Sequence, residues 1–222
     1  MPLNNFHQRG NFLIIAVCVP TTHGRTVSLM WAVNTHTVLA NVPHVLAVRT
    51  DYSVDRNREA LAEQALATPG VAHILWMDDD IWPPPNVVPG MLARKYPIVS
   101  GVYVDKQNRM CAGMFSGDGS KTPLVLNRVP APAAGQITFV DAVGLGFCLM
   151  ETNIFRRLKQ PWFEYAPSLS EDFRLFRRCG DELGIRVLLD GNVPLGHEQQ
   201  MRLSINGSVQ PLATVMQPTV IV

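Results

Sequence analysis

The chain has few cysteines, little charge and no long apolar run, and each shortage excludes a class of protein. Its four cysteines are far apart and form no Cys-x-x-Cys pair, which excludes zinc ribbons and thioredoxin-like redox sites. Charged residues make up 17% and the net charge is +1. The composition therefore shows no excess of positive charge that would favour binding to nucleic acid or to an anionic membrane. There is also no internal repeat and no low-complexity tract.

The longest apolar run near the N-terminus covers residues 12–19 and follows Arg9. It mimics the core of a signal peptide, but no small-residue cleavage site follows and the run is too short to span a bilayer. We interpret it as a buried first strand. Three of the four cysteines lie in apolar or helical patterns, which predicts reduced thiols in the core and favours a cytoplasmic protein.

Apolar residues are plentiful, at 47% of 222 residues, so the chain can bury a large core in a single domain spanning 1–222. In the first half, predicted strands and helices alternate, and Ser53 is a candidate N-cap for one of the helices. The expected strands are 12–19, 45–48, 71–77 and 98–104, and the expected helices are 26–39, 55–67 and 87–94. This alternation predicts an α/β fold with a mainly parallel sheet flanked by helices.

The second half has a different pattern. Residues 105–136 are rich in glycine, proline and polar side chains, which predicts loops with short antiparallel strands. The elements expected after them are strands over 137–143, 146–150 and 186–189 and a helix over 168–183. Gly184 is the natural end of that helix, and residues 201–222 have no clear pattern.

Three aspartates, Asp78 to Asp80, follow directly on the apolar run 71–77. Ligands of open α/β sheets bind at the carboxyl ends of the strands, and closely packed carboxylates need a cation to neutralise them. On an extended chain, Asp78 and Asp80 point to one side and can hold Mg²⁺ or Mn²⁺ against substrate phosphates. Asp79 points to the other side and could accept hydrogen bonds from a neighbouring helix or loop. The alternative interpretation is an acidic surface turn.

A second acidic group opens the helix expected over 168–183. Glu171 fits a capping box in which Ser168 is the N-cap. Capping does not explain Asp172, which could project from the first helical turn towards a cleft. A carboxylate in that position can act as a general base on an attacking hydroxyl.

Three further motifs carry candidate binding residues. Gly196-His197 follows the last expected strand, and its imidazole would complete a mixed oxygen and nitrogen site suited to Mn²⁺, although a lone histidine is more often structural. Arg56-Asn57 lies in a first helical turn, where phosphate binds well; the alternative, an exposed arginine, applies equally to Arg58. Gly144-Leu145-Gly146 permits close approach of a ligand or of another backbone.

Taken in order, these elements resemble the GT-A class of glycosyltransferases, and especially its compact family that contains many inverting enzymes. The motifs that carry the resemblance, between Phe12 and His197, are the first strand with its Pro20-Thr21 loop, Arg56-Asn57, Met77-Asp78-Asp79-Asp80, Val99-Ser100-Gly101-Val102-Tyr103, Val143-Gly144-Leu145-Gly146-Phe147-Cys148-Leu149-Met150, Glu171-Asp172-Phe173 and Gly196-His197. The resemblance implies that residues 1–104 form a nucleotide-sugar-binding half and 105–200 an acceptor and catalytic half, followed by a C-terminal tail, 201–222.

The resemblance implies a metal-dependent enzyme whose donor is a nucleoside-diphosphate sugar, with a UDP- or GDP-sugar expected first. The diphosphate of that donor would bind Mn²⁺ or Mg²⁺. Asp80 and His197 correspond to the metal ligands of the family, and Asp78 to the residue that contacts the ribose or the sugar. Asp79 is then left with a structural role.

The other site residues are implied in the same way. Thr21 and Asp51 fall where such enzymes hold the nucleoside, and Arg56 falls where they hold the base or the phosphate. Gly144 to Gly146 match the loop that lines the sugar and the acceptor. Asp172 matches the carboxylate that serves as base in inverting members, so transfer to an acceptor hydroxyl with inversion is expected. The acceptor itself and a retaining outcome stay open.

Three rival functions stay open beside this one. A sugar-nucleotide pyrophosphorylase should carry a glycine-rich loop with arginine and lysine after the first strand, and Pro20-Thr21-Thr22-His23-Gly24-Arg25 lacks that density. A non-catalytic nucleotide- or carbohydrate-binding GT-A domain would not need all of the carboxylates and His197. A metal-dependent hydrolase would usually need a richer cluster of histidine and aspartate.

Overall fold

The computed structural model describes residues 14–21, 29–50, 53–104, 110–117, 124–166 and 169–197. Several predicted features lie outside the described residues. They are the first two residues of strand 12–19, the start of helix 26–39, Asp51, Ser168 and the tail 201–222.

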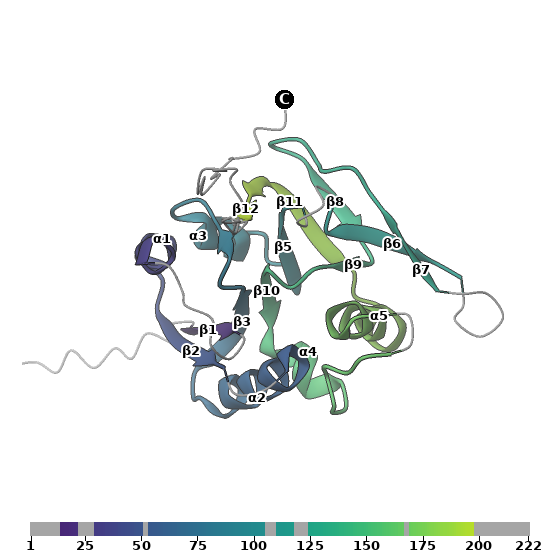
Figure 1. Cartoon of the computed structure of the whole chain (residues 1–222), viewed down its shortest axis with the longest axis horizontal. Helices are drawn as coiled ribbons and strands as arrows, with labels where there is room; N and C mark the ends of the chain where they lie inside the picture. The colour runs from purple at the N-terminus through teal and green to yellow at the C-terminus, as the bar shows by residue number, and fades with distance from the viewer. Residues whose placement is uncertain are drawn as a thin grey trace, which may run out of the picture.

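A seven-stranded sheet with the order β2-β1-β3-β10-β5-β11-β8 forms the centre of the molecule (Figure 1). Its strands are β1 (Ile14–Pro20), β2 (His44–Arg49), β3 (Val71–Met77), β5 (Ile98–Val102), β8 (Ile137–Val140), β10 (Phe147–Glu151) and β11 (Val187–Pro194). Strands β1, β2, β3, β5 and β11 run in one direction, while β8 and β10 run in the other. The predicted mainly parallel sheet is therefore confirmed.

Strand β10 is inserted antiparallel between β3 and β5. The sequence predicted a strand at this position but not its place in the sheet. Because both of its faces are covered, β10 is a continuous apolar run, and such a run looks the same whether the strand is parallel or antiparallel. The two halves of the chain therefore share one sheet.

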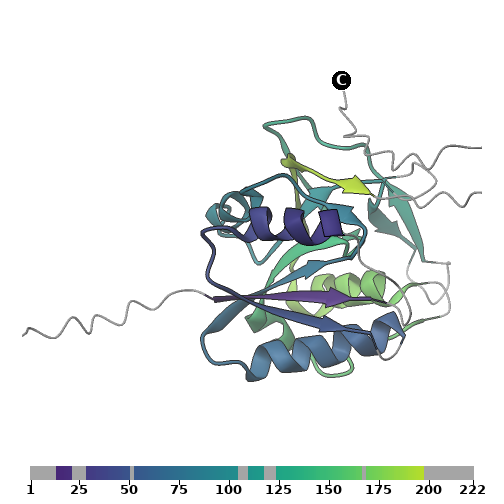
Figure 2. The same cartoon turned by 60° about the vertical axis from the view of Figure 1, so that its left-hand side comes forward.

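Helices cover both faces of the sheet, as Figure 2 shows with α1 on one side and α2 and α5 on the other. Helices α1 (Leu29–Leu39) and α3 (Val87–Ala93) pack on one face. Helices α2 (Val54–Ala67), α4 (Thr152–Arg157) and α5 (Glu171–Leu183) pack on the other. The side chains of β1 alternate between the two cores, as the pleat of a strand requires. The sheet is thus the middle layer of three.

The helix ends confirm one predicted N-cap residue and correct another. Ser53 is the N-cap residue of α2, but its hydroxyl makes no capping hydrogen bond. Helix α5 begins at Glu171 with Ser170 as its N-cap, so the predicted capping box from Ser168 is wrong. Gly184 ends α5 as predicted: its φ of 68° is left-handed, and its N–H donates to the Gly180 carbonyl at 3.0 Å.

Two small sheets complete the described part of the chain. Strands β7 (Val125–Arg128), β6 (Ala112–Ser116) and β9 (Ala142–Val143) form an antiparallel sheet, as expected for the polar second half. Strand β4 (Ile81–Trp82) pairs with β12 (Gly196–His197). The sequence did not predict that pairing or helix α4. No helix among the described residues is both long and apolar enough to cross a membrane.

The four cysteines are free thiols. Cys18, Cys148 and Cys179 are buried in the core between the sheet and α2, α4 and α5, which confirms the prediction for three of them. Cys111 is half-buried.

Candidate functional site

The candidate site lies at the carboxyl ends of β1 and β3, which point to the same edge of the sheet because the two strands are parallel. Strand β3 ends at Met77, and Asp79 and Asp80 form a turn. The Asp78 N–H donates to the Gly146 carbonyl at 2.9 Å, which joins this turn to the glycine loop. The extended chain ends before the aspartates, so the predicted alignment of Asp78 with Asp80 on one side of a strand does not apply. The three aspartates contact three different segments.

Asp80 faces His197, and the two side chains meet across the β4–β12 pairing. His197 lies opposite Ile81, the residue after Asp80, and its Nε2 is 3.4 Å from Asp80 Oδ2. The Nδ1 of His197 is 2.9 Å from the Val104 carbonyl oxygen. A carbonyl only accepts, so Nδ1 is the ring nitrogen that donates to Val104, and Nε2 is the ring nitrogen that faces the Asp80 carboxylate. A carbonyl that orients the ring in this way is typical of a metal-binding histidine.

Asp79 contacts the end of β1. The Thr21 hydroxyl donates to Asp79 Oδ2, and the Asn57 side-chain amide donates to the Thr21 carbonyl at 3.0 Å. All three residues are buried. This chain of hydrogen bonds ties β1, α2 and the aspartate turn together, and it commits the Thr21 hydroxyl to the protein.

Asp78 contacts Arg58, a residue that the sequence analysis did not place in the site. Arg58 Nη2 donates to Asp78 Oδ1 at 3.2 Å, and Nη1 donates to Glu171 Oε1. The exposed-arginine interpretation is wrong for Arg58, which is 4% exposed, whereas Arg56 is exposed. A signal was present, because Arg58 shares the buried stripe of α2 with Leu61, Ala62 and Ala65.

Burial and repulsion shape the charges around Arg58. Burial raises the pKa of Asp78 to about 6, with Asp80 adding to the rise and Arg58 opposing it. The pKa of Glu171 is also raised, first by burial and then by Asp172, again against Arg58. Burial opposes the charge on Arg58, but the surrounding carboxylates raise its pKa overall. One buried guanidinium thus holds two carboxylates, those of Asp78 and Glu171, together.

Asp172 lies half-buried in the first turn of α5. The Oδ1 atom of Asp172 accepts two hydrogen bonds. One comes from the Ser170 hydroxyl, and the other comes from the Phe173 N–H at 2.8 Å. These two bonds orient the carboxylate relative to the start of the helix. The negative charge of Asp172 helps to raise the pKa values of Arg58 and Asp78. Asp172 therefore interacts electrostatically with both residues.

Gly144 and Gly146 make room for Tyr103. The Gly146 N–H donates to the Tyr103 hydroxyl at 3.1 Å. A Cβ atom added at Gly144 would lie 2.2 Å from that oxygen, and one added at Gly146 would lie 2.9 Å from it. The close approach predicted for these glycines is therefore occupied by a protein side chain. The Tyr103 ring also packs edge-on to His197, with centroids 5.9 Å apart.

Asp80 and His197 could supply two ligands to a hard divalent cation, with the substrate and water supplying the others. Among the described residues, no group of three or more histidine, cysteine, aspartate or glutamate side chains could hold a metal ion. One carboxylate and one imidazole fit Mn²⁺ or Mg²⁺, because these ions take their other ligands from phosphates and water. Asp51, the other predicted nucleoside contact, lies outside the described residues.

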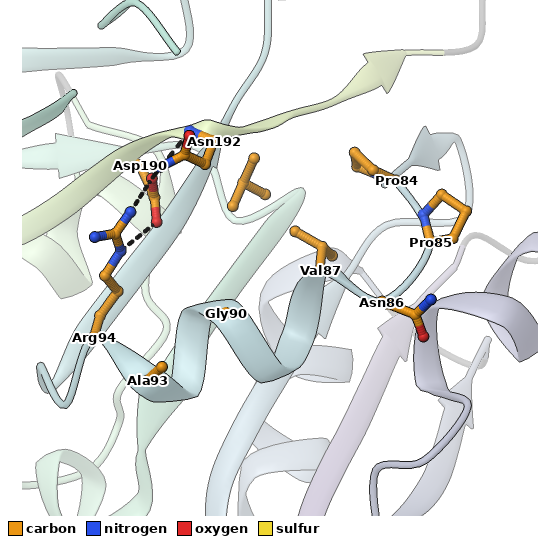
Figure 3. Close-up of a pocket in the computed structure, with 10 residues that line it drawn as sticks. Pro84, Pro85, Asn86, Val87, Gly90, Ala93, Arg94, Asp190 and Asn192 are labelled. Carbon is orange, nitrogen blue, oxygen red and sulfur yellow. Dashed lines mark hydrogen bonds and ion pairs between the residues drawn. The ribbon is translucent and has the colours of Figure 1, made fainter. Parts of the chain in front are cut away.

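A separate pocket of about 460 Å³ lies between the Pro84–Asn86 segment, α3 and the end of β11 (Figure 3). In it, Arg94 Nε and Nη2 donate to the two carboxylate oxygens of Asp190 at 2.6 and 2.8 Å. The backbone and side chain of Asn192 donate to the same carboxylate. Arg94 and Asn192 both bind Asp190, and none of Asp78, Asp79 and Asp80 lines the pocket.

Comparisons with known proteins identify the fold. No protein-family model matches the chain, and no curated protein matches it in sequence. The crystal structure of A197 from STIV aligns with a TM-score of 0.60 and 17% identity, over 83% of this chain and 85% of that one. The crystal structure of GalNAc-T7 with UDP, GalNAc and Mn²⁺ aligns with a TM-score of 0.56 and 14% identity, over 88% of this chain and 47% of that one. The chain spans about half the length of that second structure, and the two share a GT-A-like α/β fold.

Proposed function

We propose that this chain is a metal-dependent glycosyltransferase that moves a sugar from a nucleoside-diphosphate sugar to an acceptor hydroxyl with inversion. The observation that carries the proposal is the pairing of Asp80 with His197, whose Nδ1 is bound to a backbone carbonyl and whose Nε2 faces the carboxylate. This pair lies at the edge of the sheet where ligands of α/β folds bind. The fold shared with GalNAc-T7, a structure that contains UDP, GalNAc and Mn²⁺, supports the same function.

Each site residue has a role in the proposed reaction. Asp80 and His197 would hold Mn²⁺ or Mg²⁺, which when bound neutralises charge on the departing diphosphate. Asp172 takes the proton of the acceptor hydroxyl as its oxygen bonds to C1 of the sugar and the bond from C1 to the diphosphate oxygen breaks. The sugar passes through an oxocarbenium-like state, as in glycoside hydrolysis. Asp78 contacts the ribose or the sugar.

The remaining residues bind the donor and the acceptor. Asp51 and Thr21, whose hydroxyl donates to Asp79 but can still accept a hydrogen bond, contact the nucleoside. Arg56, exposed on the first turn of α2, reaches the base or a phosphate. Gly144 to Gly146 line the sugar and the acceptor. Residues 1–104 supply most of the donor site and 105–200 the acceptor side. The four free cysteines support a cytoplasmic location.

A thermal-shift screen tests this function. UDP-, GDP-, CDP- and dTDP-sugars are each added with and without Mn²⁺. A ligand at about 100 times its Kd stabilises the fold by about 2.7 kcal/mol, which corresponds to a rise in Tm of roughly 5–10 °C for a chain of this size. We expect one nucleotide class to give this rise only when Mn²⁺ is present.

The variants Asp80→Ala and His197→Ala serve as controls for that screen, and both should abolish the rise. No rise with any nucleotide, or the same rise in Asp80→Ala, would show that the proposed function is wrong. Release of nucleoside diphosphate from the donor that binds then separates an enzyme from a binding domain. Binding without any release over many hours would make the chain a non-catalytic binder.

A further inference from the structure

Arg58 is a buried cation between two acidic motifs that lie far apart in the sequence. It belongs to α2, and its side chain is 5% exposed. One end of its guanidinium donates to Asp78, 20 residues away, and the other donates to Glu171, 113 residues away. Arg58 therefore connects three elements, namely α2, the turn after β3 and the start of α5.

Stability alone does not account for this arrangement. Arg58 and Glu171 are buried while Asp78 stays partly exposed, and burying such an ion pair carries a large desolvation penalty. Apolar residues of similar volume often stabilise a core as well or better. The Nε of Arg58 adds to that penalty, because it is buried without a hydrogen-bond partner. The specific contribution of Arg58 is geometric. Its guanidinium is a planar, forked group, and its two Nη atoms fix the carboxylates of Glu171 and Asp78 relative to each other.

Each of the two carboxylates lies within two residues of a residue with a proposed role. Glu171 immediately precedes Asp172, the proposed base, and both lie in the first turn of α5. Asp78 belongs to the same turn as Asp80, the proposed metal ligand. A bridge from Glu171 to Asp78 therefore sets the separation between the base and the metal-binding pair.

We propose that Arg58 is a positioning residue, which locks the start of α5 onto the aspartate turn so that Asp172 faces the donor held at Asp80 and His197. This inference rests on the proposed function. Without Arg58, the neighbouring carboxylates of Asp78, Glu171 and Asp172 would repel one another and the start of α5 would move outward. The rise in the pKa of Arg58 caused by these carboxylates supports the coupling.

Kinetics of Arg58 variants test the inference, with donor hydrolysis or transfer measured on whichever nucleotide sugar the wild type uses. Displacement of a catalytic group by about 1 Å lowers kcat by about 100-fold, and we expect a loss of that order in Arg58→Met. Binding of Mn²⁺ and the nucleoside diphosphate of that donor, measured by calorimetry, should change much less than kcat, because Asp80 and His197 are intact. Arg58→Lys keeps the charge without the fork, so it should recover part of the lost kcat.

Two further variants separate positioning from loss of stability. Arg94→Met breaks a bidentate pair with buried Asp190 away from the aspartate turn, so it should lower Tm with no comparable fall in kcat. Glu171→Gln leaves the shape of the contact and removes its charge. It should lower kcat in the wild-type background and have a much smaller effect in Arg58→Met, because the two residues act through one bridge.

The outcomes distinguish this inference from the proposed function. If the wild type binds no nucleoside diphosphate with Mn²⁺, the proposed function fails and this inference fails with it. If the wild type is active and Arg58→Met loses no more kcat than Arg94→Met at an equal loss of Tm, the inference alone is overturned. Additive effects of Arg58→Met and Glu171→Gln on kcat would also overturn it. If Arg58→Met does not fold, Arg58→Lys and Glu171→Gln decide the question in the same assay.

Discussion

Tyr103 connects the glycine loop to the candidate metal ligands. Its hydroxyl accepts a hydrogen bond from the Gly146 N–H, and its ring packs edge-on to His197. It is 8% exposed, so its hydroxyl needs this partner inside the protein. Burial also raises its pKa well above the usual value, which keeps the ring neutral. The small residues at 144 and 146 are thus explained by a single large neighbour.

A double-mutant cycle on Gly144 and Tyr103 measures this packing. Gly144→Ala would place a Cβ atom 2.2 Å from the Tyr103 hydroxyl oxygen. We expect it to lower the free energy of unfolding by about 1–3 kcal/mol, the usual range for an overpacked core. Tyr103→Phe removes that oxygen, so the alanine should cost less in the Tyr103→Phe background. Urea unfolding of the four proteins gives the comparison, and an equal cost in both backgrounds would contradict the steric explanation.

Among single residues, the sequence was most informative where a motif has a chemical meaning. It paired Asp80 with His197, and the structure brings these two side chains together although they are far apart in the chain. It did not identify Arg58, because an arginine in a helix is usually solvated and its two partners are made neighbours only by the tertiary fold. It also predicted that Asp79 could accept a hydrogen bond from a neighbouring helix or loop, and Asp79 does accept one, but the identity of the donor, Thr21, depends on the tertiary fold.

Helix α2 is the element that organises the site. Three consecutive residues in its first turns bind three different segments: Asn57 binds the end of β1, Arg58 binds the acidic motifs, and Glu59 binds the chain after α4. Glu59 Oε2 accepts the N–H groups of Trp162 and Phe163 at 2.9 and 3.0 Å. These contacts hold α2 in place from both sides, so its position should be sensitive to Glu59.

Removal of Glu59 tests that attachment. Glu59→Ala leaves two partly buried N–H groups without their acceptor, and we expect a loss of about 1–3 kcal/mol in the free energy of unfolding. Glu59→Gln keeps an acceptor oxygen and should lose less. Glu63→Ala, one turn later on the same helix, removes an exposed bond to Gln160 and should have little effect. Denaturant unfolding measures all three, and equal losses in the Ala and Gln variants of Glu59 would contradict this account.

The pH dependence of these variants has a defined sign. Burial raises the pKa of Glu59 above its ordinary value of 4.5, against the lowering effect of the Phe163 and Trp162 N–H groups. The folded state therefore binds the proton more tightly than the unfolded state. The stabilisation from this group is complete below the unfolded pKa and is lost as pH rises through the folded pKa. Glu59→Gln should remove the contribution of Glu59 to the slope of the unfolding free energy against pH.

At the element scale, predictions succeeded where local signals are strong. Strand β3 was predicted with its observed bounds, and α2 within one residue, because one is a continuous apolar run and the other a good helix former that ends before Pro69-Gly70. The β4–β12 pairing could not be predicted in this way. Its strands have two residues each, and their pairing depends on contacts between distant parts of the chain.

At the scale of the whole molecule, the two halves of the chain are interleaved in one sheet. Strand β10, from the second half, lies between β3 and β5 of the first half, and β11 pairs with the other side of β5. Strand order of this kind depends on long-range pairing, which a single sequence does not report. The proposed donor and acceptor halves therefore contribute strands to the same sheet.

This interleaving predicts that residues 1–104 do not fold alone. In that fragment β5 would lose both of its neighbours and β3 would lose one, which exposes the fully buried Leu75, Trp76, Ile98 and Val99. Circular dichroism of the fragment should show no cooperative thermal transition. The complete chain should unfold in one transition, with coincident curves from circular dichroism and tryptophan fluorescence, because Trp76 and Trp162 report on both halves. A folded fragment, or two separate transitions in the complete chain, would show instead that the first half is an independent domain.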